Sequence, residues 1–181
     1  NLDEVWTMDL LGEGTMDRLQ IARLQFDGFQ DTRINAAGTL VGLANPQNAG
    51  GNFSIYNLHT TKADMEMLAG NSLAGTGINL PQTVDVSGLI SGNTGRLNTR
   101  LDINTTDGNL DLQGSFANLT SPTSLSFDAT IRASRLQLGK LQGMQGQVGP
   151  LTGTVSANGR GVTPGTINTT FQAAIASVGY N

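Results

Sequence analysis

The fold is decided by one stretch, residues 96–134, which reads RLNTRLDINTTDGNLDLQGSFANLTSPTSLSFDATIRAS. Apolar and polar residues alternate in it three times over, and a turn signal separates each run from the next. Alternation with a period of two is typical of a β-strand that has one apolar and one polar face. Asp107-Gly108 is a dipeptide typical of tight hairpin turns. We therefore predict three consecutive strands, over residues 97–103, 110–116 and 127–133.

The same alternation recurs along the rest of the chain. It predicts further strands over residues 2–11, 18–29, 32–43, 52–60, 82–91, 151–158 and 166–178. The phase shifts by one residue near Ala22-Arg23, which predicts a β-bulge. A helix over residues 16–26 is the alternative there, but Gly28 and the alternation after it favour a strand. Gly12-Glu13-Gly14-Thr15 is interpreted as a turn.

Two short stretches interrupt the strands and predict helical inserts, near residues 63–69 and 136–142. The first is followed by a Gly-rich segment and a new pair of strands, and so is the second. The windows Gly38–Pro46 and Gly114–Pro122 also align, which gives a repeat of about 75 residues. We predict one repetitive β domain with units of about 1–80 and 81–149 and a partial unit 150–181. Because the strand pattern runs to both ends, we expect a fragment of a larger protein.

The predicted fold class is all-β: a long antiparallel meander of about 10–12 strands. Short connections favour antiparallel neighbours. No long amphipathic helix is predicted that could cover the apolar face, so the sheet must curl into a barrel, a sandwich or an open groove. The apolar face would either line a groove or form a packed core, since both demand the same alternation. Its clearest members are Leu97, Leu101, Ile103, Leu110, Leu112, Phe116, Phe127, Ile131, Val155 and Phe171.

Composition excludes several classes of function. Charged residues make up 13% of the chain, against about 25% in ordinary domains. The net charge is −4, and the 10 Lys and Arg residues form no cluster, which argues against a nucleic-acid partner. The chain has no Cys, so disulfides and thiolate metal sites are excluded. No apolar run has the length of a membrane span.

No group of residues predicts catalysis. His59 is the single histidine, and beside Thr60 and Thr61 it is expected to be a structural residue of a loop or strand end. Carboxylates that could bind Ca²⁺ are Asp3-Glu4 and the set Asp102, Asp107 and Asp111, but their outer-face and turn positions are typical of solvated acids. We therefore predict no catalytic residue, no cofactor and no metal, and a protein that is not an enzyme.

The repeated succession of elements resembles that of TamB and the wider AsmA-like group. The elements shared by this chain and that group follow in a fixed order. They are a strand with Gly-x-Leu/Phe, a polar loop with Pro, a second strand, a Leu-rich insert and a Gly-rich strand. The matching residues are Gly114–Phe116, Phe127–Ala133, Leu136–Gly143 and Leu151–Gly161, with an earlier copy at Gly38–Leu43 and Phe53–Gly70.

The resemblance implies a location and partners. Members of this group are large envelope proteins of Gram-negative bacteria with an N-terminal inner-membrane anchor. Their periplasmic part is a long β-sheet rolled into an apolar groove, and they are implicated in outer-membrane protein assembly and in moving phospholipids. The chain is accordingly expected in the periplasm, with membrane association through parts outside it. Its expected partners are phospholipid or unfolded outer-membrane protein, together with an outer-membrane assembly protein.

Two classes of function stay open at this point. In the first, an apolar groove shields lipid acyl chains, and each CH₂ group removed from water contributes a free energy of about 0.8 kcal/mol. In another version of this class, the protein binds an outer-membrane strand by β-addition. In the second, stacked β-modules with a packed core serve a structural or adhesive role. An enzymatic function is a third and weaker hypothesis, since the sequence shows no pair of carboxylates beside exposed aromatic residues, as a carbohydrate-active site would need. Trp6, Met65 and Met67 would line a lipid path or close the end of a local core.

Overall fold

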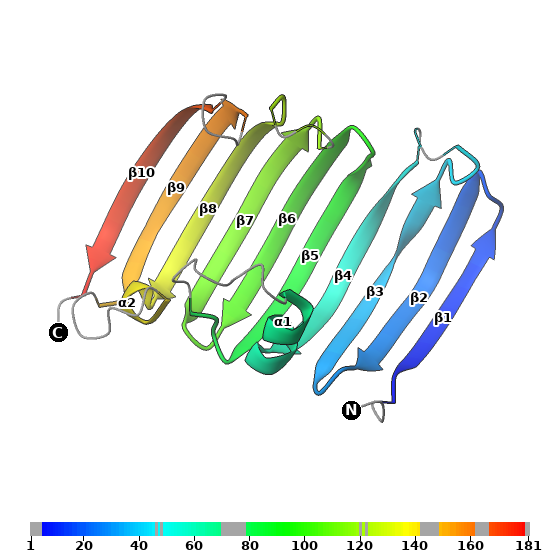
Figure 1. The fold of residues 1–181 in the computed structure, drawn as a ribbon, viewed down its shortest axis with the longest axis horizontal. Helices are drawn as coiled ribbons and strands as arrows, with labels where there is room; N and C mark the ends of the chain where they lie inside the picture. The colour runs from blue at the N-terminus through cyan, green and yellow to red at the C-terminus, as the bar shows by residue number, and fades with distance from the viewer. Residues whose placement is uncertain are drawn as a thin grey trace.

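A single antiparallel sheet of ten strands makes up the fold, and the strands are ordered in space as in the sequence (Figure 1). This computed structural model describes residues 5–45, 47, 49–69, 79–119, 121, 123–141, 149–161 and 167–179. The two edge strands, β1 (Thr7–Gly14) and β10 (Asn168–Val178), do not pair with each other. The predicted all-β meander is confirmed, and it is an open, groove-like layer rather than a closed barrel or a two-sheet sandwich.

Eight further strands and two short helices complete the described fold. Both predicted helical inserts are present, α1 at Lys62–Ala69 and α2 at Leu138–Leu141. Gly70 and residue 142, which the sequence places at the helix ends, lie outside the described residues. α1 follows β4 and α2 follows β8, so one insert comes after each set of four strands. The predicted boundaries of the repeat units stay a prediction. The strands are β2 (Arg18–Gly28), β3 (Thr32–Val41), β4 (Gly50–Thr61), β5 (Thr83–Asn93), β6 (Arg96–Thr105), β7 (Gly108–Ala117), β8 (Ser126–Leu136) and β9 (Leu151–Arg160).

The predicted turn at residues 12–15 is wrong. Gly12, Glu13 and Gly14 belong to β1, and the turn comes after them, where the Thr15 and Arg18 backbones exchange hydrogen bonds of 2.8 and 3.1 Å. Gly14 has a φ of +135°, and a Cβ at this position would lie 2.1 Å from the Arg18 carbonyl oxygen. The glycine therefore serves a close approach of two strands, not a chain reversal.

The bulge predicted near Ala22-Arg23 is confirmed, and others occur that the sequence did not reveal. The β2–β3 register shifts between Ile21 and Leu24. Further shifts lie at residues 55–58 of β4, 133–136 of β8 and 175–177 of β10. At each shift one strand has one residue more than its partner strand. The extra residue is accommodated in the bulge, so the next apolar side chain still points to the apolar face. The bulges thus keep the two faces chemically distinct over long strands.

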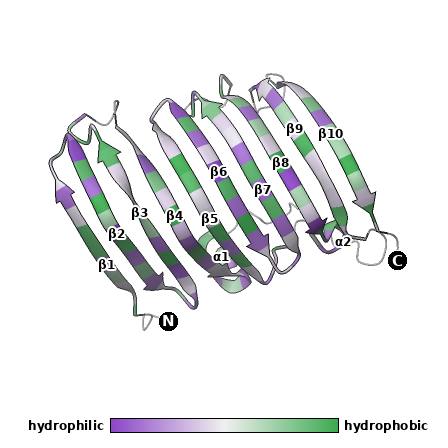
Figure 2. Ribbon diagram, turned by 180° about the vertical axis from the view of Figure 1, so that it is seen from behind, coloured by the Kyte–Doolittle hydropathy of each residue, from purple (hydrophilic) through white to green (hydrophobic). Residues whose placement is uncertain are grey.

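Cross-strand register gathers the apolar residues into rows that cross the whole sheet. Neighbours along a row face the same side, because partners in a ladder share the direction of their side chains. Figure 2 shows the resulting hydrophobic bands running across successive strands. One complete row is Leu10, Leu24, Ala36, Ile55, Gly88, Leu101, Leu112, Ile131, Val155 and Ala173.

The insert α1 is attached to the sheet through one buried carboxylate, Asp64, whose residue is 0% exposed. Thr61 caps the helix, accepting a hydrogen bond from the Asp64 N–H at 3.4 Å. The Asp64 carboxylate accepts hydrogen bonds from the N–H groups of Gln30 and Asp31 at 3.0 and 2.9 Å. The Thr32 hydroxyl donates a third at 2.8 Å. Asp64 therefore holds the β2–β3 turn against the start of α1.

Burial by itself raises the pKa of the Asp64 carboxyl. The hydrogen bonds from the Asp31 N–H, the Thr32 hydroxyl, the Gln30 N–H and Thr61 outweigh burial, and the pKa lies below its ordinary value. A carboxylate with a lowered folded-state pKa adds stability above its unfolded pKa and loses it as the pH falls through the folded pKa. Asp64 thus stabilises the fold at neutral pH.

We expect Asp64→Asn to lower the free energy of unfolding at pH 7 by about 1–3 kcal/mol, because buried donors lose their charged acceptor. The difference from the unchanged protein should begin to narrow as the pH falls below about 4, where the unfolded carboxyl takes up a proton, and should close as the pH falls through the lower folded-state pKa. Urea unfolding at several pH values measures this. Glu66→Gln, on the exposed side of the same helix, is the control. A loss of stability that does not depend on pH would contradict the role of the charge.

Candidate functional site

The candidate site is the apolar face, the side of the sheet that carries the apolar rows. Cross-strand pairing places all ten residues proposed from the sequence on this face. Leu97 stands opposite Phe116, and Phe116 opposite Phe127. The other members lie in parallel rows on the same side: Leu101, Leu112, Ile131 and Val155; Ile103 and Leu110; and Phe171, which stands opposite Ala157. Their contact with any cargo stays a prediction.

The apolar face is uncovered over most of its area. Among the described residues only Ile21 and Ala36 are buried hydrophobic side chains. Ile131 is 42% exposed, Val155 43% and Phe171 73%. The chain exposes 11535 Å², whereas a compact monomer of its mass exposes roughly 8,300 Å². The excess is expected of a sheet that has no second layer.

The two helices lie at one margin and leave the centre of the face open. We call this the lower margin, where β2–β3, β4–β5, β6–β7 and β8–β9 connect, and the opposite strand ends the upper margin (Figure 1). In Figure 1 α1 lies in front of the lower ends of the strands, and it packs against β4. Its Met67 and Leu68 are exposed. At the same margin Trp6 forms an aromatic cluster with Phe26 and Phe29, with ring centroids 6.3 and 5.0 Å away.

A notch interrupts the apolar face near the upper margin. Gly51 and Gly92 pair across β4 and β5, and neither carries a side chain. The result is a hollow of about 200 Å³, walled among others by Leu40, Phe53 and Leu97. A Cβ on Gly51 would lie 2.3 Å from the Thr39 carbonyl oxygen, so a larger residue cannot fill the notch without moving the backbone. The notch is therefore an apolar recess that is built into the backbone of the sheet.

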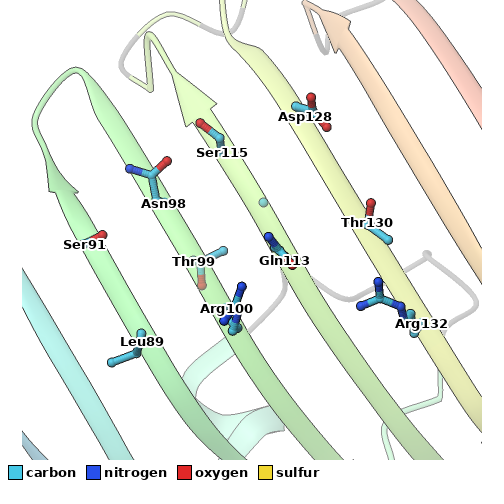
Figure 3. Close-up of a pocket in the computed structure, with 11 residues that line it drawn as sticks. Leu89, Ser91, Asn98, Thr99, Arg100, Gln113, Ser115, Asp128, Thr130 and Arg132 are labelled. Atoms are coloured by element: carbon cyan, nitrogen blue, oxygen red, sulfur yellow. The ribbon is translucent and has the colours of Figure 1, made fainter.

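The opposite side, the polar face, has a larger hollow of about 530 Å³ across β5–β8 (Figure 3). Leu89 is the one large apolar side chain among its lining residues. Arg100 and Arg132 stand on either side of Gln113, and Asp128 lies farther up β8. Neutral hydroxyl and amide groups provide most of the remaining lining. Such a surface is well hydrated and offers no seat for an apolar cargo.

The carboxylates considered as Ca²⁺ ligands are not brought together. Asp102 and Asp111 stand directly opposite each other on β6 and β7. Asp107 lies in the turn between these strands and forms an ion pair with Lys140 at 3.2 Å. Asp3 and Glu4 lie outside the described residues. Within the described ranges, no three His, Asp or Glu side chains lie close enough to hold a metal ion.

The facing pair of carboxylates affects its own protonation. A hydrogen bond with Asp111 raises the pKa of Asp102, and lost hydration and the negative charge of Asp111 act in the same direction. Arg100 lowers it, but to a smaller extent. Like charges directly opposite in a sheet are destabilising, so this pair opposes folding when both groups are ionised.

His59 lies in β4 on the polar face, rather than in a loop, and is the centre of a charged cluster. Its Nδ1 is 2.7 Å from Asp85 Oδ1, and its Nε2 is 3.7 Å from Asp31 Oδ2. Arg33 forms ion pairs with Asp31 at 2.6 Å and with Asp27 at 3.6 Å. The cluster joins β2–β5 near the lower margin, and His59 lies near the end of β4, which confirms the predicted strand-end position.

Sequence reasoning missed the notch, the polar hollow and the His59 cluster. Each combines residues from several strands, and only the register of neighbouring strands brings them together. The signal that could have found the notch is Gly50-Gly51 and Gly92, since glycines at strand positions mark close backbone approach.

No protein family, curated protein or solved structure was found to match this chain. Neither helix in the described part of the chain combines the length and apolar character needed to cross a membrane.

We expect Ile131→Asp to reduce binding of a solvatochromic apolar dye severalfold, because it places a charge at the centre of the apolar face. Arg132→Asp, one residue on, is the matched control: its side chain lies on the polar face, and dye binding should be nearly unchanged. Fluorescence titration of both folded variants measures the difference. Equal losses would contradict the assignment of the two faces.

We expect Asp102→Asn to raise the melting temperature at pH 7, because it removes one of two facing negative charges. A carboxyl whose folded-state pKa is raised opposes folding as the pH rises above its unfolded pKa, and has no effect when protonated in both states. The gain should therefore disappear near pH 3. Asp128→Asn serves as the control for a change of net charge alone. A gain that persists in acid would contradict the explanation.

Proposed function

We propose that this chain is a non-enzymatic segment of a cell-envelope protein similar to the TamB and AsmA-like group, and that its apolar face shields the acyl chains of lipids in the periplasm. The observation that carries the proposal is the apolar face, which extends across all ten strands and is largely uncovered in the described part of the chain. Exposed apolar patches of this extent are uncommon on monomeric soluble proteins and mark sites of interaction.

The dimensions of the face suit several acyl chains. The sheet has ten strands spaced by about 4.8 Å, so β1 and β10 lie about 43 Å apart. β6 has 10 residues, which at about 3.3 Å each span about 33 Å. One leaflet of a bilayer has a hydrocarbon thickness of about 15 Å, half of the roughly 30 Å core. A lipid tail can therefore lie along a strand with room to spare.

The energetics need no specific polar site. Each CH₂ group removed from water contributes about 0.8 kcal/mol, and any aliphatic surface supplies that gain. A face of mainly aliphatic side chains and glycines is smooth enough to let a chain slide along it. Within the described residues, no three His, Asp or Glu side chains lie close enough to hold a metal ion.

The alternative structural or adhesive role is disfavoured by the same observation. Modules that merely span distance need a packed core, and the described residues contain two buried hydrophobic side chains. An outer-membrane protein strand is the other cargo considered. Addition of a strand uses the backbone groups of a sheet edge, whereas the extensive apolar surface lies on the face. The geometry therefore favours lipid tails.

Replacing Leu112 by a photo-crosslinking amino acid should capture lipid in Gram-negative cells, because this position lies at the centre of the apolar face. The same substitution at Gln113, the next residue but on the polar face, should capture little. Mass spectrometry of the purified adducts identifies the cargo. Equal capture at both positions, or capture of none, would overturn the proposal, and adducts with unfolded outer-membrane protein would replace lipid by a protein cargo.

A further inference from the structure

Three arginines stand in one row at the upper margin. Arg18 begins β2, Arg96 begins β6 and Arg160 ends β9, so each occupies the last strand position before a turn or connection. All three are exposed. Pairing between neighbouring strands places them in the same cross-strand row, which contains no carboxylate: Arg18, Val41, Gly50, Asn93, Arg96, Ala117, Ser126 and Arg160.

The charges at the two margins are arranged differently. At the lower margin three cations have acidic partners: Arg33 lies 2.6 Å from Asp31, Lys62 is 3.6 Å from Glu66, and Lys140 is 3.2 Å from Asp107. At the upper margin, no carboxylate in the described part of the chain lies within 4.0 Å of the three arginine side chains. These three lower cations are thus paired within the protein, and Arg135 near the lower end of β8 is not, whereas none of the three arginines of the upper row has such a partner among the described residues.

The arginine row lies beside the apolar notch. Asn93 is both a lining residue of the notch and the cross-strand partner of Arg96. On the polar side of the same glycines, Arg18 lines a hollow of about 260 Å³ that also includes Gly51 and Gly92. Arg18 and Arg96 therefore lie close to the apolar recess, on the opposite side of the sheet, whereas Arg160 lies three strands farther along the row.

We infer that the apolar face selects anionic phospholipids and holds them in one orientation, with each tail along the strands and each phosphate at one arginine of the upper row, Arg18, Arg96 or Arg160. This inference rests on the proposed lipid-shielding function. A guanidinium is suited to phosphate because its donors form a planar fork that matches the phosphate oxygens.

The position of the arginines at strand ends makes the contact geometrically accessible. Long cationic side chains extend along apolar surface while their charged groups stay in water. From the last position of a strand, such a side chain can pass the margin and meet a head group whose tail lies on the other face. A zwitterionic head group adds an ammonium that finds no carboxylate in this row. The row therefore favours a head group of net negative charge.

The test compares lysophosphatidylglycerol and lysophosphatidylcholine with the same fluorescent tail, each below its micellar concentration. We expect the anionic probe to bind the unchanged protein about fivefold more tightly or better, since one cation near an anionic lipid contributes a factor of this order. In the triple variant R18Q/R96Q/R160Q, both probes should bind with the affinity of the neutral one. High salt should reduce the preference in the unchanged protein and leave the zwitterionic probe unaffected.

The matched control is R23Q/R100Q/R132Q, which removes three charges elsewhere on the sheet and should keep the preference. Binding of the zwitterionic probe reports that each variant retains its apolar face. No preference in the unchanged protein, or a preference that survives in the margin variant, would overturn this inference while the lipid-shielding proposal stands. Failure of both probes to bind the unchanged protein would instead overturn the proposed function.

Discussion

The rest of the structure depends on the hydrogen-bonded register between neighbouring strands. A slip of one residue in any pair would turn a whole strand's apolar side chains to the polar face. The sheet crosses nine strand pairs, and the rows stay in phase through each of them. The bulges contribute to this: where β4 would drift out of phase, the shift between Ile55 and Leu58 brings Leu58 and Thr60 back to the apolar face. The register therefore gathers the apolar residues, which alternate along the sequence, onto one face of the sheet.

A sheet of one layer must obtain its stability without a large core. The backbone ladder and cross-strand side-chain pairs supply most of it, since few apolar side chains are removed from water completely. Polar contacts at the lower margin add local support. Asp64 fixes the β2–β3 turn to α1, and the ion pair between Lys140 and Asp107 joins the α2 segment to the β6–β7 turn. The lower margin is therefore closed by the protein's own contacts.

Much of the fold could be predicted because alternation reports directly on strands. The three strands of residues 96–134 and both helical inserts follow from pattern alone. The turn expected at Gly12–Thr15 was wrong because glycine marks a close strand approach as readily as a reversal, and Gly14 serves the former. The membership of the apolar face was predictable residue by residue. Its exposure was not, because a covered and an uncovered face demand the same alternation, and only the absence of a second layer separates them.

The two margins give the sheet a direction that its repeats do not show. Arg18 begins β2 and Arg96 begins β6, four strands apart, and the register of neighbouring strands places Arg160 in the same row. At the lower margin, carboxylates pair with Arg33, Lys62 and Lys140, and the helices occupy strand ends. A surface that gains energy only from CH₂ groups would hold a lipid tail in either direction. If the apolar face binds lipid as proposed, the arginine row at the upper margin is the feature that would make one direction lower in free energy.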